Sequence, residues 1–223
     1  MPLLKILFIL AMMAFAGTVR AAEPPDVLVK RVTEDVMQTA RTDRAIRSGD
    51  RSRIVEVVKD KILPHLDFER ATRLAMGRHW REATPRQRQQ MMDEFRTLMI
   101  YTYAGALSQI SDQRLDYRPL RLSPDDNEAE VRFRVLRPRR GEPVEVSYRM
   151  IRSPDGWKVY DVNVLGVWIT EVYRSSFSEE VTRNGVDGLI SRLAERNREL
   201  RTRQVLTTPT PAEALPGSGG SQG

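Results

Sequence analysis

Few side chains in this 223-residue sequence belong to the types that carry acid–base or metal chemistry. There are two histidines, His65 and His79, and no cysteine. The lack of cysteine excludes disulfides, thiolate metal sites and cysteine nucleophiles, and two histidines are too few for a multi-histidine metal site. Asp161 lies between Tyr160 and Val162 in an apolar segment, where a carboxylate beside a tyrosine could abstract a proton, as in some isomerases. Structural roles are more common for such isolated residues, so they do not by themselves predict an enzyme.

The charged residues do not indicate a nucleic-acid partner. The sequence has 36 Lys and Arg against 30 Asp and Glu, a formal net charge of +6. Basic and acidic residues alternate, as in 195–199, which is typical of solvated helix faces. The basic run Arg-Pro-Arg-Arg at 137–140 could bind anionic headgroups, but a solvated hairpin tip is the favoured interpretation. The sequence also lacks a His-Glu-x-x-His motif, a phosphate-binding glycine loop and a nucleophile elbow.

The N-terminal 22 residues have the three parts of a secretory signal peptide. Lys5 precedes an uninterrupted apolar run over 6–16, and small residues follow up to a cleavage site near Ala22. This run is shorter than the roughly 20 residues of a membrane span, and no cysteine follows it that could carry a lipid anchor. We therefore predict an exported and soluble mature protein. Residues 202–223, rich in Pro, Gly, Ser and Thr, predict a disordered tail.

The elements that would position a site begin with a helical region over 26–110. Apolar residues recur there at helical spacing. The predicted helices cover 26–47, 51–63, 67–76 and 84–110. Asp67 is placed to cap the third helix and Gly77 to end it. Thr84, Pro85 and Gln87 form a capping box with proline at the first helical position, which predicts the start of the fourth helix.

From residue 114 to 164 the apolar period changes from 3.6 to 2, which predicts strands. Pro119 places the first strand, over 115–122, at an edge of the sheet. Apolar residues then alternate with charged or polar ones at Val131, Phe133, Val135, Val144, Val146, Tyr148 and Met150. The turn Pro154-Asp155-Gly156 leads to a last strand that ends at Val164. The pattern predicts a meander of about four antiparallel strands with one apolar and one charged face.

Helical spacing returns at 167–201, with Gly185 separating two amphipathic segments. We therefore predict an α+β fold in which a curved antiparallel sheet is covered by N- and C-terminal helices, forming one domain over 23–201. The inward-facing methionines and aromatic residues, such as Met91, Phe95 and Tyr148, could be core or could line an adaptable lipid or peptide site. Composition alone favours the interpretation that these residues form the core.

Two stretches of the sequence resemble the MlaC (toluene-tolerance) family of periplasmic phospholipid-binding proteins. The first is 75–85, Ala-Met-Gly-Arg-His-Trp-Arg-Glu-Ala-Thr-Pro, followed by Arg86-Gln87-Arg88 and Phe95. The second is 157–162, Trp-Lys-Val-Tyr-Asp-Val, followed by Gly166-Val167 and by Gly-Val-Asp-Gly-Leu at 185–189. Five weak motifs in register make the resemblance specific, and with the signal peptide and element order it covers about residues 26–200.

The resemblance implies a lipid carrier rather than an enzyme, with bound lipid as cargo and no other cofactor. It implies a cone similar to nuclear-transport-factor-like domains with a helical subdomain, holding acyl chains inside. The implied partners are a phospholipid, an outer-membrane lipoprotein complex and an inner-membrane ABC transporter. We expect the lipid pocket to be formed by apolar residues from three regions of the chain: Phe95, Leu98, Met99, Val131, Phe133, Val135, Val146, Tyr148, Met150, Val164, Val167 and Trp168.

The sequence departs from the family pattern beside the Gly-Val motif. Trp168 stands where the family often has serine, and Leu165 where an acidic residue often precedes the glycine. A tryptophan there could shorten the cavity or line it for a ring-bearing lipid such as a hopanoid. Two hypotheses besides a lipid carrier stay open: an isomerase-type enzyme using Asp161 or His79, and an adaptor that bridges membrane complexes without binding lipid.

Overall fold

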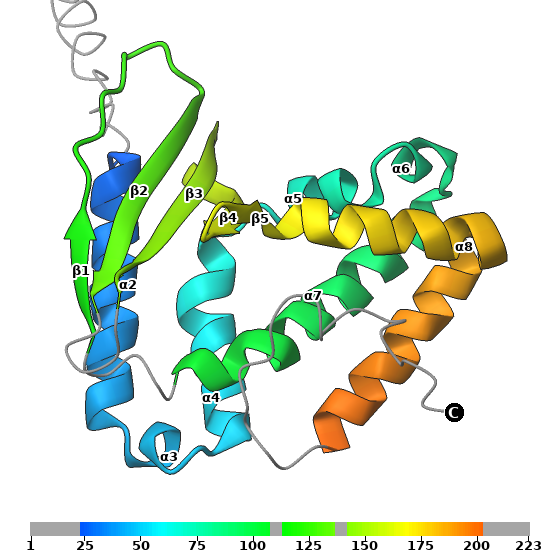
Figure 1. Ribbon diagram of the computed structural model, residues 1–223, viewed down its shortest axis with the longest axis horizontal. Helices are drawn as coiled ribbons and strands as arrows, with labels where there is room; N and C mark the ends of the chain where they lie inside the picture. Colours follow the sequence, from blue (N-terminus) through cyan, green and yellow to red (C-terminus); the bar gives the residue numbers. More distant parts are fainter. Residues whose placement is uncertain (1–22, 108–112, 137–141, 203–223) are drawn as a thin grey trace, which may run out of the picture.

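The computed structural model describes residues 23–107, 113–136 and 142–202 (Figure 1). The predicted signal peptide, the basic tip at 137–140 and the predicted tail beyond residue 202 lie outside the described residues. Among the residues described, no helix is both long enough and apolar enough to cross a membrane.

The described helices follow the labels of Figure 1. They are α2 (Pro25–Thr42), α3 (Arg44–Arg47), α4 (Arg51–Val57), α5 (Phe68–Met76), α6 (His79–Glu82), α7 (Pro85–Leu107) and α8 (Ile169–Thr202). A π-helical turn, Val58–Ile62, and a 3-10 turn, Leu63–His65, extend α4.

The predicted caps are present. The Asp67 side chain accepts from the Arg70 amide at 2.9 Å, and the Thr84 hydroxyl accepts from the Gln87 amide at 3.3 Å.

The helix boundaries differ from the predictions at three places. The predicted helix over 26–47 is divided at Asp43, whose carboxylate accepts from the amides of Ala45 and Ile46 and so begins α3. The helix predicted over 51–63 is α-helical only to Val57. The two predicted C-terminal helices are continuous in α8 apart from a kink at Gly185, where φ is 70°.

The sheet is a five-stranded antiparallel meander in the order β1-β2-β3-β4-β5. Its strands are β1 (Arg114–Tyr117), β2 (Glu128–Leu136), β3 (Val144–Ser153), β4 (Gly156–Val164) and β5 (Val167–Trp168). The structure confirms the predicted α+β fold and adds the two-residue strand β5. β1 is shorter than predicted, since it ends two residues before Pro119, which cannot donate to a strand ladder. A bulge at Arg149/Met150 shifts the register between β3 and β4.

Apolar residues of the described chain pack in separate clusters. Helix α2 lies along the sheet, and α5, α7 and α8 form a helical part on the other side of the molecule (Figure 1). The helical cluster joins α5 to α8 and is closed to solvent; among its residues are Ala75, Met76, Met91, Phe95, Leu98, Tyr173, Phe177, Leu189 and Leu193. A second cluster packs α2, α3 and α4 against Ile100 of α7. The third lies between α2 and the apolar face of the sheet.

Candidate functional site

The apolar face of the sheet is the feature best suited to hold a ligand. Strand pairing places Tyr117, Phe133, Val146, Val164 and Val167 in one row across the five strands. Residues paired directly across antiparallel strands point to the same face. The exposed fraction rises along this row, from 3% at Phe133 and 8% at Val146 to 37% at Val164 and 50% at Val167. The apolar face is therefore buried at β2 and opens to solvent at β5.

Helix α2 explains this gradient. Leu28 and Val29 of α2 are buried in the cluster that contains Val131 and Phe133 of β2. An amphipathic helix laid on one half of a sheet removes that half from water. Trp157 of β4 is buried in this cluster and Val159 packs against it, whereas Val164 and Val167, beside the turn between β4 and β5, lie outside it.

Three aromatic rings line the middle of this face. The rings of Tyr117 and Phe133 lie 5.4 Å apart, and those of Phe133 and Tyr148 lie 5.1 Å apart in an edge-to-face arrangement. The hydroxyl of Tyr117 is buried and lies beside the side chain of Thr33 on α2. Burial raises the pKa of Tyr148 to about 12, and the nearby phenol of Tyr117 contributes to this shift. The face is therefore apolar but carries two phenol groups.

The exposed end of the row is a tight turn between β4 and β5. Leu165 is 66% exposed and has a φ of 54°, and Gly166 has a φ of 88°. Two central residues with positive φ are characteristic of a type I′ hairpin turn, which favours Asn-Gly. The Leu165 amide donates to the Glu145 carbonyl at 3.0 Å, and the Gly166 amide donates to the Asn163 side chain at 2.9 Å. Leucine is thus held in a conformation that costs it free energy.

The opposite face of the sheet is charged and contains Asp161. Both oxygens of this buried carboxylate accept hydrogen bonds from Thr170 at the start of α8, from the amide at 3.2 Å and from the hydroxyl at 2.7 Å. Arg149 lies 3.6 Å from the carboxylate. Burial raises the pKa of Asp161 and outweighs these contacts, which lower it. The arrangement is a helix cap joined to an ion pair.

The candidate acid–base residues have separate partners. His79 is buried, with Nδ1 2.9 Å from a Glu82 oxygen and Nε2 3.3 Å from the Ser178 hydroxyl. Burial lowers the pKa of His65, and the nearby Arg31 adds to this effect. No three His, Asp or Glu side chains of the described residues are grouped as a metal site would require.

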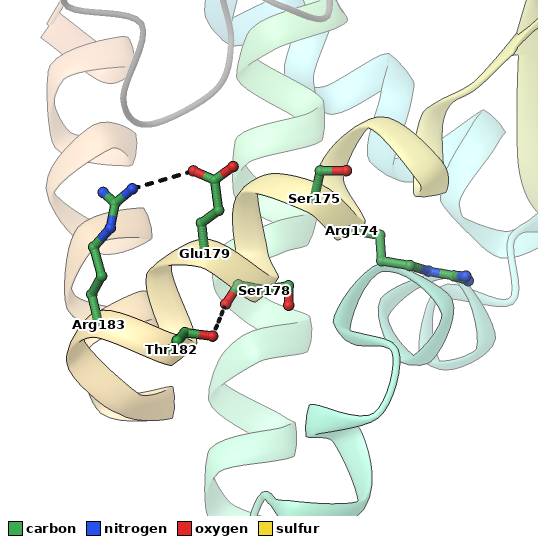
Figure 2. A pocket seen from close by; sticks show the side chains of 6 residues that line it. All are labelled: Arg174, Ser175, Ser178, Glu179, Thr182 and Arg183. Carbon is green, nitrogen blue, oxygen red and sulfur yellow. Dashed lines mark hydrogen bonds and ion pairs between the residues drawn. The ribbon is translucent and has the colours of Figure 1, made fainter.

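A shallow depression of about 530 Å³ lies along α8 (Figure 2). All of its lining side chains come from that helix: Arg174, Ser175, Ser178, Glu179, Thr182 and Arg183. The Thr182 hydroxyl donates to the Ser178 carbonyl at 2.7 Å, and Arg183 lies 3.4 Å from Glu179. A lining that comes from one helix face alone does not enclose a ligand.

Comparison with known proteins identifies the family. The sequence model of the MlaC protein matches residues 30–195. The chain belongs to the MlaC family.

Curated relatives include the intermembrane phospholipid transport system binding protein MlaC of Haemophilus influenzae. It is 21% identical over 190 residues, which cover 84% of this chain and 89% of the relative. The toluene tolerance protein ttg2D of Pseudomonas putida is 24% identical over 175 residues, covering 78% of this chain and 80% of the relative.

A solved structure is similar over its whole length. It is the phospholipid-binding protein of Ralstonia solanacearum in complex with a phospholipid, with 42% sequence identity and a TM-score of 0.75. The match covers 81% of this chain and 100% of that chain.

The structure of this MlaC-family chain divides the predicted pocket residues among three places. The strand residues share the apolar face: Val131, Phe133, Val135, Val146, Tyr148, Met150, Val164 and Val167. Phe95, Leu98 and Met99 belong instead to the helical cluster around Tyr173 and Phe177. They do not contribute to the cluster on the sheet, because the face of α7 that carries them packs against α5 and α8.

Trp168 does not share the apolar face. It pairs with Asn163, which lies on the same face of β4 as Asp161, and the Arg149 guanidinium lies 3.6 Å from the centre of its ring. The Trp168 side chain therefore lies on the charged side of the sheet, and its predicted role in shaping a lipid cavity stays a prediction. Its ring and the cation form a stacked pair beside Asp161.

Sequence reasoning also missed part of the face. Val162 pairs with Tyr148 on the apolar side, and Leu115 and Tyr117 of β1 pack against the same cluster, as does Val32 of α2. The alternation that identified Val164 two residues later indicates Val162 as well. The contribution of α2 has a weaker signal, since an amphipathic stripe shows that a helix is covered but not by what.

Proposed function

We propose that this MlaC-family protein is a non-enzymatic periplasmic carrier of phospholipid. The acyl chains lie on the apolar sheet face beside α2 and reach solvent at the turn between β4 and β5. The rise in exposure from Phe133 to Val167 carries this proposal, since it continues an apolar surface from the interior to the outside. The phospholipid held by the Ralstonia protein, 42% identical over its whole length, supports the same class of ligand here.

The energetics favour such a site. Exposing an acyl chain to water costs about 0.8 kcal/mol per methylene, so two long chains cost about 20 kcal/mol. A carrier must therefore cover nearly all of both chains with uncharged surface. The row from Phe133 to Val167 carries no charged residue, and the charged side chains of the same strands, such as Glu130 and Arg132, belong to the opposite face.

The name of the Haemophilus relative, which refers to an intermembrane phospholipid transport system, supports a transport role. We propose that the protein moves lipid between an outer-membrane lipoprotein complex and an inner-membrane ABC transporter. A reversible exchange requires that the chains leave through an opening, and the exposed valines at Val164 and Val167 provide an apolar rim for it.

Native mass spectrometry of the mature protein, purified from periplasmic extract without detergent, tests this function. We expect a discrete added mass that matches a diacyl phospholipid. A hopanoid mass would keep the carrier and change its cargo. A protein without any added mass, even after incubation with phospholipid vesicles, would contradict the proposal and favour an adaptor role.

A further inference from the structure

The turn between β4 and β5 carries most of the exposed apolar side chains of the described residues. Four large apolar residues are exposed in the part of the chain that the structure describes, and three of them are Val164, Leu165 and Val167. Leu165, at 66%, is the most exposed of the four. An added Cβ at Gly166 would meet no atom of the described residues within 4 Å beyond its chain neighbours. The turn is therefore an apolar tip, formed by Val164, Leu165 and Val167, with open space around it.

Leucine is unfavourable at position 165 for two reasons. The φ of Leu165, 54°, is a left-handed conformation that a residue with a Cβ rarely adopts. Its apolar side chain is also left in water. An asparagine would avoid both costs, since it tolerates positive φ and is polar. Strained residues cluster at functional sites, so this combination favours a role for the Leu165 side chain outside the fold.

The hydrogen bonds of the apolar tip favour one kind of partner. The Leu165 amide donates to the Glu145 carbonyl at 3.0 Å, and the Gly166 amide donates to the Asn163 side chain at 2.9 Å. Both amides are thus satisfied within the sheet and need no acceptor from outside. The hydrocarbon of a bilayer offers no acceptors, whereas a protein partner is usually recognised through hydrogen bonds as well. The tip therefore matches the acyl-chain region of a lipid bilayer.

The apolar tip is also continuous with the proposed lipid site. Val164 and Val167 form the exposed end of the apolar row, and Leu165 lies in the turn that joins them. An acyl chain that crosses water between a membrane and the site is exposed along its whole length, which is highly unfavourable. A tip inserted among the acyl chains would instead provide an apolar path from the bilayer to the row.

We propose that Leu165 inserts among the acyl chains of a lipid bilayer and so accelerates the uptake and release of lipid. This inference rests on the proposed function and adds a step to it. Leu165 affects the rate of transfer and not the final occupancy, because its side chain is needed only while the protein touches the membrane. The rate should therefore be proportional to the concentration of vesicles, as expected for transfer by collision.

Uptake of lipid from vesicles tests this proposal. The delipidated mature protein is mixed with vesicles of phosphatidylethanolamine and phosphatidylglycerol that contain pyrene-labelled phosphatidylglycerol. The loss of pyrene excimer emission gives the rate of uptake, and native mass spectrometry gives the final occupancy. We expect Leu165→Asn to lower the rate by about tenfold or more, the range for burial of one leucine side chain, and to reach the occupancy of the wild type.

Two control variants separate the apolar tip from other effects of substitution. Leu165→Met keeps an apolar side chain and should keep the wild-type rate. Val27→Asn removes an apolar side chain that is 48% exposed on α2, and it should also leave the rate unchanged.

The two readouts distinguish the possible failures. A wild-type rate in Leu165→Asn, or a rate that does not depend on vesicle concentration, would overturn the inference. Lower final occupancy in Leu165→Asn would place Leu165 in the lipid site itself and would also overturn it. A wild-type protein that holds no lipid at the end of the incubation would overturn the proposed function, and this inference with it.

Discussion

The helical cluster and the apolar sheet face contain the same kinds of side chain, yet they are closed to different degrees. In the helical cluster, Phe95, Tyr173, Phe177 and Leu193 are at most 1% exposed, and the ring of Phe95 lies 5.0–5.5 Å from three other aromatic rings. On the sheet face, exposure rises step by step toward Val167.

Under the proposed function, this difference distinguishes a core from a lipid-binding surface. A region packed on every side has no room for a ligand and contributes to stability. A region that is covered on one half and exposed on the other can bind an apolar ligand, which then removes the exposed half from water. Changes in the helical cluster should therefore affect folding, and changes on the sheet face should affect lipid binding.

The largest effect is expected from Phe95→Ala in the helical cluster. Removing this ring leaves a cavity between α5, α7 and α8, and the free energy of unfolding should fall by about 3–5 kcal/mol. Urea titration measures this loss. The amount of lipid per folded molecule should stay unchanged in native mass spectrometry. A variant that folds normally but loses its lipid would place Phe95 in the binding site and remove the distinction between the two regions.

Removal of lipid should have the next largest effect. A ligand that binds only the folded state stabilises it by about 2.7 kcal/mol when its free concentration is 100 times Kd. Delipidated protein should therefore unfold at a Tm about 5–10 °C lower than lipid-loaded protein, as calorimetry can measure. Phe95→Ala should show the same difference between loaded and delipidated forms. A Tm that does not depend on lipid would contradict the idea that lipid covers the sheet face.

A smaller gain in stability is expected at the exposed turn. Leu165→Asn places a residue that tolerates positive φ at the first central position of the turn, so the free energy of unfolding should rise by about 1 kcal/mol. Leu165→Ala is the control, because alanine keeps the cost of the left-handed conformation and should bring no gain. A lower stability of the Asn variant would show that the leucine side chain stabilises the fold.

The smallest effect concerns the charged side of the sheet and depends on pH. Because the pKa of Asp161 is raised above the ordinary 3.8, the folded state holds its proton to higher pH than the unfolded state. Stability from this group is therefore greatest at low pH and declines as pH rises from 3.8 through the folded-state pKa.

Subtracting the unfolding free energy of Asp161→Asn from that of the wild type isolates this contribution. The difference should decrease with rising pH just above 3.8 and then become constant, with lipid content unaffected. A difference that increases with pH would mean that the hydrogen bonds from Thr170 outweigh burial.

The fold was predictable because its determinants are local. The capping box at Thr84, the cap at Asp67, the turn before Gly156 and the alternation along β2 and β3 each depend on a few neighbouring residues. The prediction missed the division of the helix at Asp43, because apolar residues such as Ala40 and Ile46 stand on both sides of it. The short strand β5 was not predictable because two residues show no period.

The proposed binding face was predictable only in part. Alternation shows which strand residues share a face, and strand pairing confirms that Phe133, Val146 and Val164 do so. Alternation does not show which helix covers that face. Phe95 lies in the helical cluster because the face of α7 that carries it packs against α5 and α8. The family motif indicates Val167 as a pocket residue. It does not indicate the face of the sheet on which Trp168 lies, which depends on strand pairing.

A pair of matched valines tests the central claim most directly. Val167 and Val27 are 50% and 48% exposed, but Val167 lies at the open end of the apolar row and Val27 lies on α2 outside the cluster on the sheet. Both are changed to glutamate, and native mass spectrometry measures lipid occupancy of each purified protein. We predict at least a roughly tenfold loss of lipid in Val167→Glu and none in Val27→Glu, with unchanged circular dichroism in both. Equal occupancy in the two variants would contradict a lipid site that opens at β5.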